Sequence, residues 1–313
     1  MTHLDYLNAN YPMRRTKEQK EGFQKHVIES LQAKGVTAKI EKTRDGKNQN
    51  IVVGDPLTAK AVFTAHYDTP GRALFPNIMI PRNQALFWTY QFVPILALLA
   101  MMFVVGLIVC VAWILITGDF DERVTFIAML LGYYVGFYLM FFAFSNKNNY
   151  NDNTSGVATL LSIIDKLSEE QLRETAFIFF DNEEKGKKGS KGYFNDHKEE
   201  MKDKLVINFD CVGNGKNIVF IAKPEAEKLA SYSALRQSFG SENGFETAFY
   251  PKKGSQSNSD YLNFPCGVGC MACKKSKKGL LYTPYIHTKK DIVVDNANIE
   301  FLVNGVTKFL EAC

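Results

Sequence analysis

At 313 residues, the chain is long enough for one large α/β domain, or for such a domain with an insertion. Its net charge is only +4 and its basic residues are dispersed, so the composition excludes the electrostatic footprint of a nucleic-acid-binding protein. The six cysteines form no paired framework like that of small secreted domains, and the polar residues 1–12 contain no apolar signal core; we therefore expect a reducing, cytoplasmic compartment.

Outside one long apolar region, the sequence alternates between helical and strand patterns. Residues 16–34 carry apolar side chains at helical spacing and end before Gly35. The apolar runs at 176–180 and 205–209 are typical of strands buried on both faces. The other expected elements are strands at 37–41, 51–53 and 61–65, a helix at 156–167, strands at 218–222, 247–250 and 268–272, and a closing helix at 299–310. This alternation predicts an α/β three-layer sandwich with a mixed, mostly parallel sheet.

Two long uncharged stretches interrupt this pattern. Residues 83–118 form a run of 36 without a charge, and residues 124–146 form a run of 23. Since about 20 apolar helical residues cross a bilayer, each run suffices for one span, and both are longer than the uncharged runs of a buried core hairpin. We expect spans at 94–117 and 125–144, with Trp88, Tyr90 and Phe92 as interfacial aromatics. The sequence thus predicts a domain of residues 1–81 and 146–313 and a transmembrane helical hairpin at 82–145.

The charges flanking the hairpin predict its orientation. Arg72, Arg82 and Lys147 lie at its outer ends, whereas the connecting segment 119–123 holds three acids and one arginine. The positive-inside bias places the outer ends, both termini and the domain joined to them in the cytoplasm, with membrane lipid around the hairpin. The pair Gly132 and Gly136 allows close helix approach, and a homodimer through the hairpin is one possible use of it.

Several potential metal ligands occur in segments that read as strand ends or helix starts. They are His66, Asp152, Glu184, Asp210 and His287. Two imidazoles and three carboxylates suit a pair of Zn²⁺ ions, and Co²⁺ or Mn²⁺ suits the same donors. In an α/β sheet such residues gather at the carboxyl ends of the strands.

A two-metal hydrolase needs a carboxylate shared by both ions, and Asp152, in a tight Asn-Asp-Asn turn, is the candidate. We expect His66 and Asp210 to complete one site and Glu184 and His287 the other. Two zinc ions about 3.5–4 Å apart would hold a bridging hydroxide and neutralise a tetrahedral oxyanion.

Two further carboxylates have expected roles beside the metals. Asp68 lies two residues after His66 on an extended segment, so its side chain is placed to orient the imidazole. Glu183 precedes the ligand Glu184 and points elsewhere, as the general base that takes a proton from the bridging water and passes it to the leaving amine.

These segments resemble those of the co-catalytic di-zinc aminopeptidases, metallopeptidase family twenty-eight. The matching motifs are His66-Tyr-Asp68, Asp152-Asn-Thr-Ser155-Gly156, Glu183-Glu184-Lys-Gly186, a strand ending in Asp210, and Ile286-His287-Thr288-Lys-Lys-Asp291. Residues 259–264 also resemble a family segment near the substrate pocket. The resemblance implies a sheet of about eight strands, two zinc ions, a cis peptide bond after Asp152, and removal of N-terminal residues from peptide substrates. The hairpin between the first two ligands departs from the family pattern.

Two alternative functions share this sequence pattern. One is a glutaminyl-cyclase-like transferase of the same fold, which uses one zinc and cyclises an N-terminal glutamine. The other is a non-catalytic membrane scaffold, against which the intact Glu183 argues. Zinc content near two per chain favours the peptidase over the cyclase.

Two other motifs have competing interpretations. Cys266, Cys270 and Cys273 have the spacing of an iron–sulfur motif, but the segment between them reads as a buried strand, which puts Cys270 and Cys273 on opposite faces. The lysine cluster, which consists of Lys185, Lys187, Lys188 and Lys191, is typical of a solvated loop. The sharper hypothesis is that it faces anionic lipid headgroups beside the hairpin.

Overall fold

The computed structural model of the chain describes residues 1–75, 77–141 and 143–312. Phe142, inside the second predicted span, and Cys313 lie outside the described residues. The helices are α1 (His3–Asn10), α2 (Lys17–Gln32), α3 (Gln84–Thr117), α4 (Glu122–Phe141), α5 (Gly156–Lys166), α6 (Glu169–Arg173), α7 (Lys188–Asp196), α8 (Lys198–Met201), α9 (Ala230–Ser238) and α10 (Asn296–Ala312). The strands are β1 (Ala38–Lys42), β2 (Gln49–Val53), β3 (Ala61–His66), β4 (Ile78–Met79), β5 (Thr175–Phe180), β6 (Val206–Phe209), β7 (Asn217–Ala222), β8 (Glu246–Pro251), β9 (Gly267–Lys275) and β10 (Leu281–Pro284).

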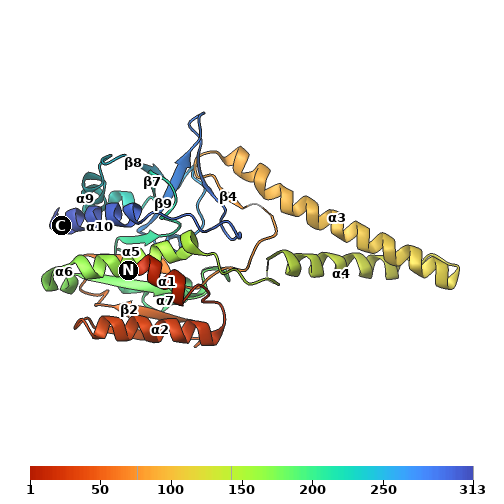
Figure 1. Cartoon of the computed structure of the whole chain (residues 1–313), viewed down its shortest axis with the longest axis horizontal. Coiled ribbons are helices and arrows are strands. Elements are labelled where there is room, and N and C mark those ends of the chain that lie inside the picture. Colours follow the sequence, from red (N-terminus) through yellow and green to blue (C-terminus); the bar gives the residue numbers. More distant parts are fainter. Residues whose placement is uncertain (76, 142, 313) are drawn as a thin grey trace.

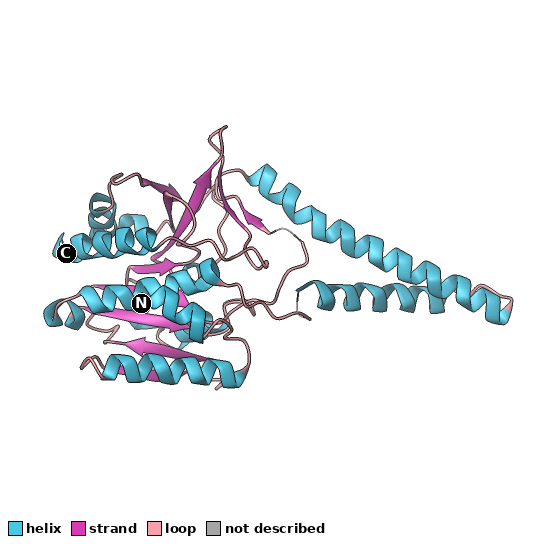
Figure 2. Cartoon of the chain, in the orientation of Figure 1, coloured by secondary structure: helices cyan, strands magenta, loops and turns pink. Residues whose placement is uncertain are grey.

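The strands form one mixed sheet, shown in magenta in Figure 2. Eight of them follow the order β1-β2-β5-β3-β6-β9-β7-β8, and the short strands β10 and β4 extend the sheet from the end of β9. The central strands β5, β3, β6 and β9 run parallel to one another. Strand β2 is antiparallel to both β1 and β5, and β7 and β8 are parallel to each other but β7 is antiparallel to β9. The predicted mixed sheet of about eight strands is confirmed.

Helices cover both faces of the sheet. Alternate residues of β5 illustrate the two layers, because Phe177 and Phe179 belong to the larger apolar core with α2, α5 and α10, whereas Ile178 and Phe180 pack with α7 and α8 on the opposite face. The ring of Phe63 in β3 stacks against Phe177 at a centroid distance of 5.8 Å. The continuous apolar run that predicted this buried strand therefore fills two cores, and the three-layer sandwich is confirmed.

The hairpin of α3 and α4 extends away from the sandwich (Figure 1). Only 11% of the most apolar stretch of α3 and 22% of that of α4 is buried, so the hairpin is not a core element of the domain. A Cβ atom on Gly132 would lie 2.7 Å from the side chain of Val105, and one on Gly136 would lie 2.3 Å from Met101. The two glycines therefore let α4 pack closely on α3. Since α3 occupies this face, the predicted homodimer would have to use another one.

Both hairpin helices are long and apolar enough to cross a membrane. The first begins at Gln84, ten residues before the predicted span, because the side chain of Asn83 caps the backbone N–H of Leu86 at 2.9 Å. It ends at Gly118, which adopts a φ of 80°. The orientation of the hairpin and the division of the chain at residues 82 and 145 stay predictions.

The helices and strands predicted from the sequence are present in the structure, and their limits differ from the predicted ones by a few residues. Several shorter elements were not predicted. Unpredicted elements are α1, α7, α8, α9, β4 and β10. The lysine cluster is only partly a loop, since Lys188 and Lys191 lie in α7 and Lys187 donates to Asn258 Oδ1 at 2.6 Å. Contact of these lysines with headgroups stays a prediction.

Candidate metal centre

Parallel strands bring the predicted ligands to one edge of the sheet. His66 is the last residue of β3 and pairs in register with Phe180, the last residue of β5. Glu184 follows β5, and Asp210 follows β6 on the other side of β3. His287 approaches from the loop after β10. The carboxyl ends of the central strands thus converge on the site, as expected for this class of sheet.

Asp152 lies at the centre of this site, in the turn that precedes α5. Its Oδ1 atom is 3.3 Å from His66 Nε2, and its Oδ2 atom is 3.0 Å from His287 Nε2. The peptide bond between Asp152 and Asn153 is cis, in agreement with the family resemblance. One carboxylate therefore faces two imidazoles with different oxygens, an arrangement that suits a ligand shared by two metals.

Two groups of potential ligands share Asp152. The first is His66, Asp152 and Asp210, and the second is Asp152, Glu184 and His287, with the ligand atoms of each group within 4.8 Å of one another. His66 Nε2 lies 3.8 Å from Asp210 Oδ1. His287 Nε2 lies 3.3 Å from Glu184 Oε2. The structure brings together all the predicted ligands, in the two groups expected from the sequence.

The donors fit a pair of zinc ions. Glu184 Oε1 and Asp210 Oδ1 are buried and make no hydrogen bond within the described part of the chain. A buried carboxylate oxygen without a partner is costly, and a bound cation would remove that cost. Imidazole and carboxylate together are ligands that zinc accepts in catalytic sites.

Left-handed backbone conformations place several of these ligands. Asn182, just before the Glu183-Glu184 pair, has φ of 54°, Cys211, just after Asp210, has 57°, and His287 itself has 60°. Such conformations cost about 1–3 kcal/mol each in residues with a Cβ and persist where the surroundings enforce them. Their concentration at the ligands marks this edge of the sheet as the functional one.

The position directly after the Asp152 turn, Gly156, has no room for a side chain. A Cβ atom there would lie 2.3 Å from the carbonyl oxygen of Phe209, the last residue of β6. Only glycine lets α5 begin so close to the strand that leads to Asp210. The glycine of the motif thus allows the Asp152 turn to lie close to the strand that leads to Asp210.

Asp68 contacts both the imidazole that it was expected to orient and the backbone of the two glutamates. His66 Nδ1 is 3.1 Å from the backbone carbonyl of Asp68, so this nitrogen carries the proton and Nε2 keeps its lone pair for a metal. The Asp68 carboxylate is 3.6 Å from the same imidazole. It accepts the backbone N–H of Glu183 at 2.9 Å and that of Glu184 at 3.2 Å. Asp68 therefore positions the two glutamates as well as the histidine.

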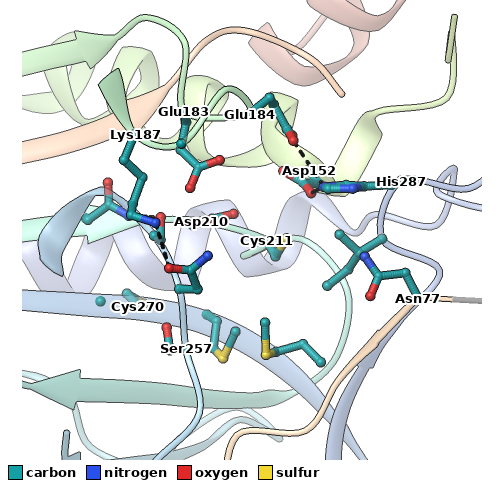
Figure 3. Close-up of a pocket in the computed structure, with 18 of the residues that line it drawn as sticks. Asn77, Asp152, Glu183, Glu184, Lys187, Asp210, Cys211, Ser257, Cys270 and His287 are labelled. Atoms are coloured by element: carbon teal, nitrogen blue, oxygen red, sulfur yellow. Dashed lines mark hydrogen bonds and ion pairs between the residues drawn. The ribbon is translucent and has the colours of Figure 1, made fainter. Parts of the chain in front are cut away.

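Glu183 and Glu184 direct their side chains to different places. Figure 3 shows Glu184 pointing to Asp152 and His287, and Glu183 turned into the neighbouring cavity. A Glu183 oxygen still lies within 4.8 Å of ligand atoms of His66 and Glu184. Desolvation raises the pKa of the Glu183 carboxyl well above its ordinary value. Glu183 is thus placed beside the ligands, with its carboxyl turned into the cavity where a substrate would lie.

Two positioning residues were missed by the sequence analysis. Asp291 accepts the backbone N–H of Asp152 at 3.0 Å and that of Asn151 at 3.3 Å, which fixes the turn of the central ligand. Arg14 is fully buried and donates to the carbonyl of Tyr67 and, at 3.1 Å, to Thr154 Oγ1. Asp291 closes the motif that begins at His287, whereas Arg14 lies far from any motif and gave no signal.

Replacing Asp291 by alanine tests its positioning role. Without its carboxylate, the two backbone N–H groups of the turn lose their acceptor and Asp152 loses its fixed direction. Because supporting partners of ligands are typically worth a factor of about 10–100, we expect zinc affinity to fall by that amount in a competition titration with a chelator. The matched control is Asp295→Ala, since Asp295 is an exposed acid paired with Lys216. Equal zinc affinity in the two variants would contradict the role.

His66 and Asp152 are separated by 85 residues that include the hairpin. Hydrogen bonds between the segment that leads into the hairpin and the segment that leads out of it help to bring these two residues together. Gly71 and Ser145 form an isolated antiparallel bridge. Ala73 donates its N–H to the carbonyl of His287 at 2.8 Å. The segment that leads into the hairpin thus contacts both the segment that leads out of it and the loop that carries His287.

A cavity of about 410 Å³ lies beside the ligands. Its lining includes Asp152, Glu183, Glu184, Asp210 and His287, together with Ser259 from the segment that resembles a family pocket segment. Less polar lining comes from Met79, Phe87, Cys270, Met271 and Ile286. The cavity can therefore hold a small substrate against the ligand groups.

The cysteine motif does not form a metal site in the described part of the chain. Cys270 belongs to the larger core and Cys273 to a core on the other face of the sheet, as alternation along β9 predicts. Burial raises the pKa of the Cys270 thiol well above its ordinary value, which opposes the thiolate that a cluster needs.

Comparison with known proteins agrees with this geometry. A family model described as peptidase family M28 matches residues 141–302. The glutaminyl cyclase of Porphyromonas gingivalis superposes with a TM-score of 0.58 at 15% identity, covering 99% of this chain and 96% of that one. A Zn-dependent exopeptidase from Parabacteroides distasonis gives 0.56 at 16% identity, covering 98% and 95%. The LapA aminopeptidase of Legionella pneumophila gives 0.56 at 14%, covering 99% and 68%. No curated protein matches the chain.

Proposed function

Because this chain belongs to peptidase family M28, we propose that it is a membrane-anchored, zinc-dependent aminopeptidase. The observation that carries the proposal is the pair of ligand groups that share Asp152 beside Glu183. When bound, two zinc ions supply a polarised substrate carbonyl and a water acidic enough to lose its proton near neutral pH. We propose that one zinc ion is held by His66, Asp152 and Asp210, and the other by Asp152, Glu184 and His287.

In this proposal the chain's own residues perform the proton transfers and the positioning. Glu183, whose carboxyl lines the cavity beside the ligand groups, accepts the proton of the attacking water and returns it to the leaving amine. Asp68 holds the backbone of Glu183 in place. His66 is held by its contact with the Asp68 carbonyl, and Asp152 by Asp291.

Two observations favour cleavage at the amino end. No arginine is among the described residues that line the cavity, and Lys187 is engaged with Asn258, so the cavity offers no bidentate partner for a substrate carboxylate. The Legionella protein of the same fold is an aminopeptidase, and the Parabacteroides protein is a zinc-dependent exopeptidase.

Anchoring at the membrane is part of the proposal. Its support is the exposed hairpin of α3 and α4, whose two helices are each long enough to cross a bilayer. We propose that the domain and both termini lie on the cytoplasmic side, as the flanking charges predict. The site then works close to the inner membrane surface.

Product analysis tests this function. Purified full-length protein is incubated with peptides that carry either a free or an acetylated N-terminus, with and without a zinc chelator, and the products are identified by mass spectrometry. We expect release of the first residue from free peptides only, and its loss in chelator. Trimming from the carboxyl end would contradict the amino-terminal specificity. Conversion of an N-terminal glutamine with loss of ammonia would favour the cyclase, the function of the Porphyromonas protein of the same fold.

A further inference from the structure

The first turns of α3 form part of the wall of the catalytic cavity. Phe87 and Gln91, one helical turn apart, line the same cavity as Glu183 and Asp210. Both side chains are partly buried, whereas the neighbouring Trp88 is 49% exposed. The helix that starts the hairpin therefore presents one face to the site and the other outward.

This start of α3 is held firmly against the domain. Arg82, just before the helix, stacks on the ring of Tyr250 at 4.3 Å and donates to Ser255 Oγ at 2.8 Å. The backbone N–H of Gln256 donates to the carbonyl of Pro81 at 2.8 Å. The loop that follows Gln256 continues to Ser259, which lines the cavity. Phe87 is thus a fixed part of the wall.

The length of α3 places this wall next to the bilayer. Its 34 residues measure about 51 Å at 1.5 Å per residue, whereas the hydrocarbon core is about 30 Å thick. The predicted span at 94–117 uses about 36 Å of this length. Residues 84–93 extend about 15 Å beyond the span, and Phe87 lies about 10 Å along the helix from Pro94.

The other hairpin helix also reaches the surroundings of the ligands. Phe137 of α4 lines a second cavity, of about 300 Å³, together with Glu184 and His287. Glu184 and His287 also line the first cavity, so the bases of both helices lie beside the same ligand group. The cytoplasmic end of the hairpin therefore forms the surroundings of the site on two sides.

We infer that the substrates are polypeptides held at the membrane surface, whose N-termini enter the cavity along the base of α3 past Phe87 and Gln91. This inference rests on the proposed aminopeptidase function and deepens it. A polypeptide that leaves the lipid surface needs only about three to five extended residues to cover 10–15 Å, at about 3.3–3.6 Å per residue. Its first residue then reaches the ligands while its anchor stays in the bilayer.

Spacer length provides the test. Full-length protein in vesicles of phosphatidylethanolamine and phosphatidylglycerol is given peptides that share their first residue and a C-terminal double-acyl anchor, and that differ in the flexible spacer of one, five or twenty residues between the two. The unanchored peptide is the reference. We expect kcat/KM to be greatest for the five-residue spacer. The one-residue spacer cannot reach the site, and the twenty-residue spacer loses about eightfold, since effective concentration falls as roughly the −3/2 power of linker length.

The outcomes separate this inference from the proposed function. Cleavage of the unanchored peptide with no dependence on spacer length would overturn the inference and leave the aminopeptidase intact. Cleavage of no peptide at all would overturn both.

A pair of variants tests the role of α3 itself. Phe87→Ala removes an apolar part of the cavity wall, and we expect KM for the five-residue-spacer peptide to rise about fivefold to tenfold, as for the loss of a buried contact of 1–1.4 kcal/mol. Phe103→Ala is the matched control, because Phe103 lies on the same helix and is 61% exposed. Equal KM values for the two variants would show that the inner face of α3 does not contact substrate.

Discussion

Glu183→Gln is expected to lower kcat by about 10²- to 10⁴-fold, while zinc content and folding stay those of the native protein. Glutamine keeps the shape of the side chain and removes its ability to accept a proton. A positioned general base contributes a factor of this size, equal to about 3–5 kcal/mol of activation free energy. The measurement is steady-state hydrolysis of an aminoacyl-anilide, with metal analysis of the same preparation.

The control for this variant is Glu199→Gln, since the Glu199 side chain is 77% exposed and pairs only with Lys202 in the described structure. We expect it to retain native activity. If Glu183→Gln retained native kcat with native zinc content, Glu183 would not be the base. Loss of zinc in Glu183→Gln would instead assign this residue to the ligands.

Asp152→Ala is expected to remove zinc from both positions, because each ligand group contains this carboxylate. Each group then keeps one histidine and one carboxylate, which is fewer than the three protein ligands of a catalytic zinc site. Loss of a residue that only supports a metal ligand lowers metal affinity or activity by about 10–100-fold. Loss of the shared ligand itself should therefore lower zinc affinity by more than this factor. Zinc per chain and anilide hydrolysis are measured together.

Thermal unfolding separates loss of metal from loss of the fold in Asp152→Ala. A ligand at 100 times its dissociation constant stabilises the folded state by about 2.7 kcal/mol, so zinc should raise the Tm of the native protein. We expect the variant to have the Tm of the metal-free native protein, and we expect this Tm not to rise when zinc is added. Asp165→Ala, which changes an acid at the surface, should keep the full rise. Two zinc ions retained by Asp152→Ala would refute the shared-ligand arrangement.

The sequence was sufficient to predict that the candidate ligands lie together, because most of them follow a readable apolar strand or occupy a recognisable turn. His66 ends β3 and Asp210 follows β6, so the parallel register of the sheet brings them together. Supporting contacts were harder to predict, because they depend on where backbone N–H groups point. The Asp68 carboxylate binds two such groups across 115 and 116 residues of chain. Arg14 acts through backbone and hydroxyl groups that no sequence spacing reveals.

The hairpin shows a different limit of prediction. Its apolar composition predicted two spans, yet composition does not define where a helix begins when the residues before the span are also uncharged. The capping side chain of Asn83 starts α3 early, and this extension brings Phe87 to the cavity. The contact between hairpin and site is therefore a consequence of one cap and of the fold around it.

The most direct test of the two-metal centre is the number of zinc ions that full-length protein must bind to become active. Metal-free protein is titrated with zinc while bound metal and release of the N-terminal residue are followed in the same samples. Two groups that share Asp152 predict full activity at two zinc ions per chain. Full activity at one zinc ion per chain, with no gain from a second, would contradict this account.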